Sequence, residues 1–153
     1  MTKSRKILLI IDLIFLGLTL IFIWGNSCLP IDESASVSSG ALGFLQGIFD
    51  FIFGEGVITH DVFRKLTHGA EFFILGTEIC VLFIILKRFS LKNLAFILSV
   101  GLFVSVIDEA IQILSIRGPA IIDVLIDFGG VFTATLIFYF ITSLIFFIKG
   151  KKN

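Results

Sequence analysis

Four long apolar runs dominate the pattern of hydrophobic and polar positions along this 153-residue chain. They cover approximately residues 7–24, 66–86, 94–116 and 120–148. A helix needs about 20 apolar residues to cross the roughly 30 Å hydrocarbon core of a bilayer, and each run is close to that length or exceeds it. The pattern therefore predicts an all-α integral membrane protein, a four-helix transmembrane bundle formed by a single domain over residues 1–153.

The first run follows Lys3, Arg5 and Lys6, an arrangement that secretory signal peptides share. A signal peptide, however, has an apolar region of about 7 to 15 residues, and the run over 7–24 is longer. We therefore interpret it as an uncleaved membrane anchor.

The segment between the first two runs divides into two parts. Residues 26–40 are rich in Ser and contain Pro30, which favours a loop. Over residues 41–53, apolar residues recur at helical spacing, namely Leu42, Leu45, Phe49 and Ile52. This stretch is too short to span, so we expect an amphipathic helix on the outer membrane surface. A disordered hydrophobic loop is the alternative.

Composition and charge narrow the class of protein further. Hydrophobic residues make up 57% of the chain and the mean hydropathy is +1.09, which excludes an ordinary soluble domain. Twelve basic and twelve acidic residues give no net charge, so binding to nucleic acid through bulk positive charge is not expected. Cys28 and Cys80 lie in unlike settings, which supports neither a disulfide nor a thiolate zinc site.

The basic residues of the short loops collect on one side of the predicted bundle. They precede the first run, separate the second from the third, and follow the fourth: Lys3, Arg5, Lys6, Lys87, Arg88, Lys92, Lys149, Lys151 and Lys152. The other side has Arg64, Lys65 and Arg117. Because cytoplasmic loops carry the excess of Lys and Arg, we expect both termini and the 87–93 loop in the cytoplasm.

Ionisable residues interrupt the apolar runs, where a charged side chain costs about 2.5–3.5 kcal/mol near the bilayer centre. Such groups usually face protein or a wet cavity, and they mark candidate functional sites. In the second run, steps of three and seven residues place His68, Glu71 and Glu78 along one helix face. The corresponding groups of the third and fourth runs are Asp108, Glu109, Gln112, Asp123 and Asp127.

All of these groups except Glu78 lie one or two turns below the outer ends of their helices. The short hairpin at 117–119 makes the third and fourth runs antiparallel neighbours, and Gly129 with Gly130 permits close helix approach. We therefore predict one polar, outward-opening pocket walled by three helices, with Lys65 and Arg117 at its rim.

Each candidate also has a purely structural interpretation. His68 could hydrogen-bond a carboxylate as structural glue, and Asp108 with Glu109 could cap or solvate a helix end. Adjacent helical residues point about 100° apart, so we expect only one of this pair to face the pocket. Gln112 is one turn after Asp108 and three residues after Glu109, and spacing does not choose between them.

Other charged groups have equally simple explanations. Arg117 could neutralise Asp123 or Asp127 instead of binding a ligand. Asp12, in the first run, could reach the cytoplasmic interface by snorkelling. Glu78 lies nearer the middle of the membrane, where protonation would remove its cost.

Two stretches resemble the signatures of the VanZ-like membrane proteins. The first is RKLTHGAEFFILG at residues 64–76, and the second contains Asp108-Glu109, Gln112, Arg117, Asp123-Val124, Asp127 and Gly130. The resemblance covers about residues 60–131 well. Three places depart from it: Phe72 where an aromatic hydroxyl is common, Phe128 where Thr is common, and Ser115-Ile116 where Pro-Gly is frequent.

The resemblance implies a bacterial inner-membrane protein whose founding relative confers low-level resistance to teicoplanin, a lipoglycopeptide that binds peptidoglycan precursors. It supplies a site but no reaction.

Three functional hypotheses follow. In the first, the pocket recognises a lipid-linked cell-wall precursor or a phospholipid head group at the outer leaflet, without chemistry. In the second, it is the active site of a membrane-embedded hydrolase or transferase, with His68 or Glu71 as general base or metal ligand and Lys65 and Arg117 holding phosphate. In the third, Glu71 and Glu78 form a proton or ion relay. No spacing matches a metal signature such as H-E-x-x-H, so the sequence names no cofactor.

We favour recognition, with an enzyme as the main alternative. The residues assigned to chemistry are His68, Glu71, Asp108 and Glu109, and those assigned to substrate binding are Lys65, Gln112, Arg117, Asp123 and Asp127.

Overall fold

The chain folds into five helices in the order α1 to α5. A computed structural model describes residues 1–29, 31–114 and 120–150, and the side chains within these ranges except those of 31–38 and 149–150. The helices are α1 (Lys3–Cys28), α2 (Ile31–Phe53), α3 (His60–Ile85), α4 (Leu91–Leu114) and α5 (Ile121–Gly150). The described residues contain no strand, so the predicted all-α class is confirmed.

Four of these helices are long and apolar enough to cross a bilayer, namely α1, α3, α4 and α5. They correspond to the four predicted runs, although α1 extends beyond both ends of its run and α3 begins several residues before its run. Many large apolar side chains point outward, among them Ile21 and Phe103, whereas Asp108 and Asp127 lie inside. This distribution is the reverse of a soluble protein, and the chain is a multi-pass membrane protein in a lipid bilayer environment.

The predicted loop over residues 26–40 is wrong. Helix α1 continues through Asn26 and Ser27 to Cys28, and α2 begins at Ile31. Pro30 stands between the two helices in the sequence, and Leu29 before it has extended backbone (φ −68°, ψ 138°), as expected for a residue that precedes proline. Ser does not stop a helix when its hydroxyl has a partner inside the protein, and Ser27 has one.

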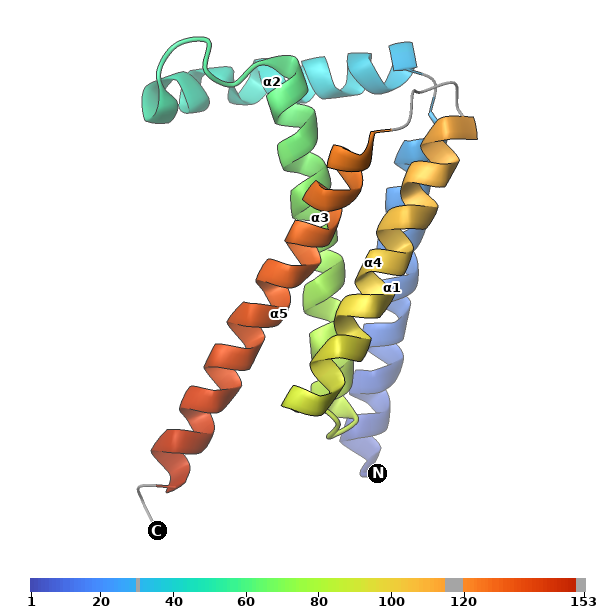
Figure 1. The fold of residues 1–153 in the computed structure, drawn as a ribbon, viewed down its shortest axis with the longest axis vertical. Coiled ribbons are helices and arrows are strands. Elements are labelled where there is room, and N and C mark those ends of the chain that lie inside the picture. Colours follow the sequence, from blue (N-terminus) through green and yellow to red (C-terminus); the bar gives the residue numbers. More distant parts are fainter. Residues whose placement is uncertain (30, 115–119, 151–153) are drawn as a thin grey trace.

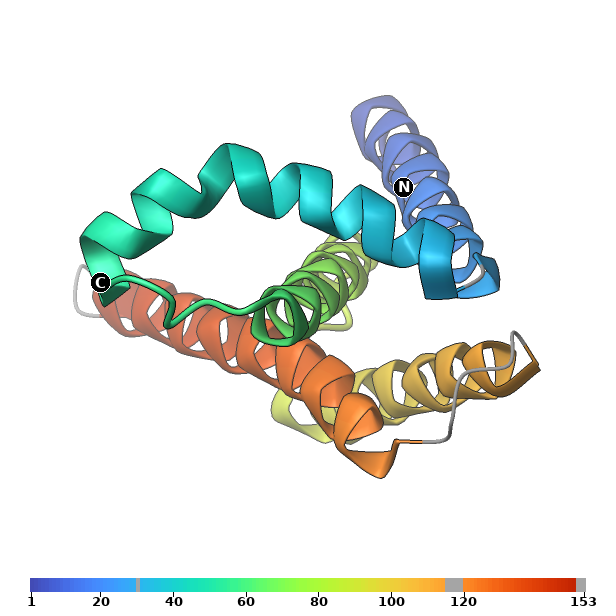
Figure 2. The same cartoon turned by 90° about the horizontal axis from the view of Figure 1, so that it is seen from above.

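Helix α2 lies across one end of the bundle, roughly perpendicular to the spanning helices (Figures 1 and 2). Leu42 is buried with Ile58 and Phe63, and Phe49 packs edge-on against Phe63 with ring centroids 5.9 Å apart. The predicted amphipathic helix is therefore present but longer than 41–53. Ile52, which shares the predicted apolar face, is 60% exposed and does not join this packing.

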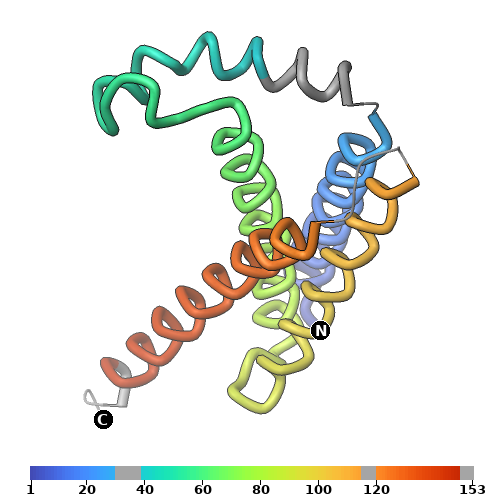
Figure 3. Tube along the Cα trace, turned by 45° about the horizontal axis from the view of Figure 1, so that its top comes forward, coloured from blue at the N-terminus to red at the C-terminus, as the bar shows by residue number. Residues whose placement is uncertain are grey.

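Helix α3 lies at the centre and contacts each of the other four helices (Figure 3). Its most extensive contact is with α5, where small residues allow the backbones to meet. A Cβ atom added at Gly76 would lie 2.8 Å from Val131 Cα, and one at Gly130 would clash with the backbone of Gly69. The predicted role of Gly130 is confirmed. That of Gly129 is wrong, because a Cβ there would meet nothing within 4 Å.

The N-terminus and the C-terminal end of α5 lie at the end of the bundle opposite α2, and α5 diverges from the other helices along its length (Figure 1). Arg5 donates hydrogen bonds from Nε and Nη2 to the carbonyl oxygen of Ile85, near the C-terminal end of α3. A cation at this place is favourable because the last carbonyls of a helix carry partial negative charge. The N-terminus and the α3–α4 loop are thereby held on the same side.

Candidate functional site

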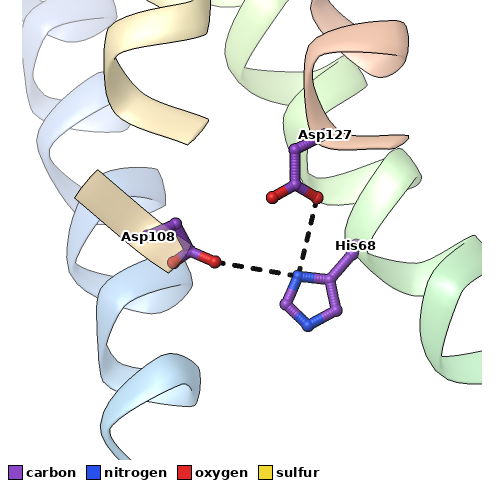
Figure 4. A group of neighbouring side chains, drawn as sticks. All are labelled: His68, Asp108 and Asp127. Carbon is purple, nitrogen blue, oxygen red and sulfur yellow. Dashed lines mark ion pairs between the residues drawn. The ribbon is translucent and has the colours of Figure 1, made fainter. Parts of the chain in front are cut away.

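Three buried or half-buried side chains from three helices meet in the half of the bundle nearest α2. His68 lies about 12 Å along α3 from its start, and Asp127 about 9 Å along α5. Asp108 lies about 9 Å before the end of α4. Figure 4 shows the two carboxylates pointing at the imidazole of His68. The structure thus brings together side chains from α3, α4 and α5 at one depth of the bundle, as the sequence predicts.

The distances in this cluster are those of ion pairs. His68 Nδ1 lies 3.7 Å from Asp127 Oδ1 and 4.0 Å from Asp108 Oδ2. The Asp108 side chain is fully buried and that of Asp127 is 1% exposed, whereas that of His68 is 16% exposed. The cluster is therefore enclosed by protein on the carboxylate side and reaches the surface through His68.

Neighbouring hydrogen bonds fix the orientation of Asp108. Ser27 Oγ donates to its Oδ1 at 2.6 Å, and Gln112 Nε2 donates to its Oδ2 at 2.7 Å. The structure thus pairs Gln112 with Asp108, an assignment that spacing left open. Both donors are neutral, so they hold the carboxylate in place without cancelling its charge.

Asp127 has a less complete environment. Its Oδ1 atom is buried and accepts no hydrogen bond from the described residues. A buried carboxylate oxygen without a donor costs free energy, which makes this atom an exception to the usual satisfaction of buried polar groups. It is the same atom that faces His68.

Glu71 lies three residues after His68 on α3 and turns toward α1. Asn26 Nδ2 donates to its Oε1 at 3.3 Å, and its Oε2 is buried with no hydrogen-bond partner among the described residues. Glu71 is therefore beside the cluster and retains an oxygen that is available to accept a proton.

Glu109 belongs to the helix connection instead. Its Oε1 accepts a hydrogen bond of 2.6 Å from the backbone N–H of Ala120, directly before α5. A carboxylate at a helix N-terminus satisfies an otherwise unpaired N–H and stabilises the helix end. Only one of the adjacent acids, Asp108, thus enters the cluster, as the helical geometry predicts.

A shallow depression lies beside the cluster and is too narrow to admit a water molecule. It is lined by four polar or charged residues and one apolar residue: Arg64, Lys65, His68, Asp123 and Ile126. Arg64 Nη2 lies 3.6 Å from Asp123 Oδ2, and Lys65 Nζ lies 2.8 Å from Asp61 Oδ2. Lys65 is at the rim as predicted, while its ammonium group is held by Asp61. Arg117, the other predicted rim residue, lies outside the described residues.

A second polar group lies between α1 and α3, farther from α2. Thr19 Oγ1 donates to Glu78 Oε1 at 2.8 Å, and Asp12 lines the same groove as Glu78. Asp12 is 8% exposed, so the expectation that it snorkels to the interface is wrong. Its Oδ2 atom is buried and has no hydrogen-bond partner among the described residues.

Sequence reasoning missed the contribution of α1. The pocket was expected between three helices, yet Asn26 and Ser27 add a fourth wall and bind Glu71 and Asp108. The polar triplet Gly25-Asn26-Ser27 at the end of the first run was the available signal. Asn26 and Ser27 fall in the stretch 26–40, for which the Ser content and Pro30 predict a loop.

The cluster has a donor set that suits a divalent cation. His68, Asp108 and Asp127 each offer one ligand atom, and these atoms lie within 4.8 Å of one another. One imidazole nitrogen with two carboxylate oxygens is compatible with first-row metals such as Zn²⁺ or Mn²⁺. Without a cation, the same groups can exchange a proton between the imidazole and a carboxylate.

Comparisons with models of protein families, with curated proteins and with solved structures found no match to this chain. The geometry of the site is therefore the basis for a functional proposal.

Proposed function

We propose that this chain is a VanZ-like protein of the bacterial cytoplasmic membrane, with both termini in the cytoplasm, that recognises a polar head group in the outer half of the bilayer. The head group belongs to a phospholipid or to a lipid-linked cell-wall precursor. Binding such a molecule changes the access of a glycopeptide antibiotic such as teicoplanin to its target.

One observation carries this proposal: the polar residues of the two stretches that resemble VanZ-like signatures converge. His68 and Glu71 belong to the first stretch, and Asp108 and Asp127 to the second. They are separated by up to 59 positions in the sequence, yet His68 Nδ1 lies within 4.0 Å of both aspartates. Ionisable residues inside a membrane are costly, so gathering them at one depth indicates a selected site.

The surroundings fit a head group that arrives from the membrane surface. Arg64 and Lys65 lie at the depression above His68, where each has an acidic partner. A phosphate or carboxylate could exchange with Asp61 at Lys65, because Asp61 is solvent-exposed and its ion pair is worth little. Hydroxyl and amino groups of the ligand would meet the carboxylates below.

A membrane-embedded hydrolase or transferase is the second candidate, and Glu71 favours it. Its Oε2 has no hydrogen-bond donor among the described residues, and it is one turn from His68. A buried carboxylate beside an imidazole is a suitable general base. Turnover of a labelled lipid by the wild-type protein, lost in Glu71→Gln, would favour this candidate over recognition alone.

The proposal is tested by teicoplanin tolerance. A sensitive Gram-positive host expressing the wild-type chain should tolerate more teicoplanin than the same host with an empty vector. His68→Gln and Asp127→Asn should remove the gain at equal membrane abundance, because both change the cluster. Glu55→Gln is the matched control, because Glu55 is exposed in the α2–α3 loop and takes no part in the proposed site, and it should retain the gain.

Two results would contradict the proposal. No gain in tolerance from the wild-type chain would remove the link to glycopeptides. A full gain in both cluster variants would show that the cluster is not the functional site.

A further inference from the structure

The three side chains of the cluster are spaced differently from a histidine hydrogen-bonded to carboxylates. A charge-assisted N–H···O bond is about 2.7–2.9 Å long, whereas Nδ1 of His68 is 3.7 and 4.0 Å from the two aspartate oxygens. Ligand atoms at about 2.0–2.2 Å from a shared metal ion lie roughly 3–4 Å from one another. The distances from His68 Nδ1 to the two aspartate oxygens therefore match those between ligands of a shared metal ion, and not those of a hydrogen bond.

The charge of the surroundings also calls for a cation. Asp108 and Asp127 are both buried, and among the described residues the hydrogen bonds to Asp108 come from the neutral groups of Ser27 and Gln112. Arg64 lies with Asp123 at the depression above. The ligand oxygens of the two carboxylates lie within 4.8 Å of each other. Charged carboxylates at such a distance repel each other strongly in an apolar medium, and a divalent cation between them would offset that repulsion.

Asp127 gives independent support, because its Oδ1 is buried and lacks a hydrogen-bond donor among the described residues while facing His68. A cation would satisfy this oxygen. Asp108, in contrast, already has the hydrogen bonds that orient a metal-binding carboxylate from outside the ligand set.

We propose that His68, Asp108 and Asp127 bind one first-row divalent cation, of the Zn²⁺ or Mn²⁺ class, in the membrane-embedded half of the bundle nearest α2. Three protein ligands leave one or more coordination positions for a ligand approaching past His68. The inference stands on the cluster alone and does not depend on the envelope function proposed above.

The cation is tested on the full chain purified in detergent and stripped with a chelator. Dialysis against buffered Zn²⁺ followed by elemental analysis should give one bound ion per chain. Asp127→Asn and His68→Gln should each weaken binding by at least tenfold. The chain has two histidines, and His60→Gln is the matched control because His60 is exposed at the start of α3.

A spectroscopic measurement on the wild-type chain guards against variants that fail to fold. With Mn²⁺ bound, electron spin-echo spectra should show coupling to an imidazole nitrogen, and His60→Gln should retain that coupling. Substoichiometric binding by the wild-type chain, loss of the coupling in His60→Gln, or undiminished binding in both cluster variants would each overturn the proposal.

Discussion

Asp108 and Asp127 show how differently two buried carboxylates are supported at the scale of single residues. Asp108 accepts hydrogen bonds from Ser27 and Gln112, and Asp127 faces His68 with an oxygen that has no donor among the described residues. The first is positioned for a task, and the second lacks a partner that a ligand or cation would supply. This asymmetry is typical of a functional site rather than of a core built for stability.

Ser27→Ala should destabilise the chain because it removes a buried donor to a carboxylate. Hydrogen bonds to charged groups are worth about 1.5–3 kcal/mol, and we expect a loss of that size in the free energy of unfolding. Ser99→Ala is the matched control, since the Ser99 hydroxyl is exposed and bonds only within α4 to the carbonyl of Ala95. Denaturant titration of the purified chain measures both, and equal losses would contradict the role of Ser27.

At the scale of single residues, sequence spacing predicts which side chains lie near one another only when they belong to the same helix. It placed His68 and Glu71 on α3 and Asp123 and Asp127 on α5, because the helical repeat is fixed. Partners on other helices, such as Ser27 for Asp108, depend on rotation and crossing of helices that a single sequence does not specify. Arg64 was likewise missed as the partner of Asp123.

The contact between α3 and α5 decides, at the scale of elements, whether the site forms. Gly76 and Gly130 remove the side chains that would keep the two backbones apart, and Asp127 lies one turn before Gly130. In a membrane, helices associate through such close packing because lipid provides no hydrophobic driving force between them. The glycine pair thus brings Asp127 to His68.

Gly130→Ala should separate α3 from α5 because the new methyl group would clash with the backbone of Gly69. Overpacking typically costs about 1–3 kcal/mol, and the unfolding temperature in detergent should fall. Gly129→Ala is the adjacent control, since a Cβ there meets open space. If both variants unfold at the same temperature, the close approach is not as described.

The predicted helices agree with the structure where the length and hydropathy of an apolar run determine a membrane span. The prediction is wrong where a helix continues into polar sequence. All four spans were predicted because a bilayer imposes a minimum apolar length. Residues 26–40 were assigned to a loop, although α1 extends to Cys28 and α2 starts at Ile31. Serine-rich sequence favours loops on average, and local packing of Asn26 and Ser27 overrides that preference here.

The whole molecule has a clear polarity along the membrane normal. Helix α2, the cluster and the depression lie toward one end, and the N-terminus, the C-terminal end of α5 and the α3–α4 loop lie toward the other (Figure 1). The basic residues at the start of α1 and those between α3 and α4 lie at this second end, namely Lys3, Arg5, Lys6, Lys87 and Arg88. Zero net charge therefore conceals a strongly segregated chain, and the topology proposed above, in which the basic end is cytoplasmic, would place the cluster in the outer half of the bilayer.

Cysteine labelling of intact cells tests this orientation. In a Cys28→Ser background, an impermeant thiol reagent added outside should react with Glu55→Cys in the α2–α3 loop. It should not react with Ser90→Cys in the α3–α4 loop until the cells are opened. Both positions are exposed in the structure, so the difference reports the side of the membrane. The opposite pattern would reverse the topology.

The central claim is that the buried carboxylate of Asp127 serves function and does not hold the helices together. The most direct test compares the unfolding temperature of Asp127→Asn with that of its parent after both have been treated with a chelator. Both proteins carry Cys28→Ser, so that a thiol-reactive dye reports only the exposure of the buried Cys80 on unfolding. Without a cation, Asp127 contributes repulsion, so we predict that the variant is at least as stable as its parent. A fall in unfolding temperature that corresponds to a loss of about 3–5 kcal/mol in the free energy of unfolding would contradict the claim, because breaking a stabilising buried ion pair has a cost of that size.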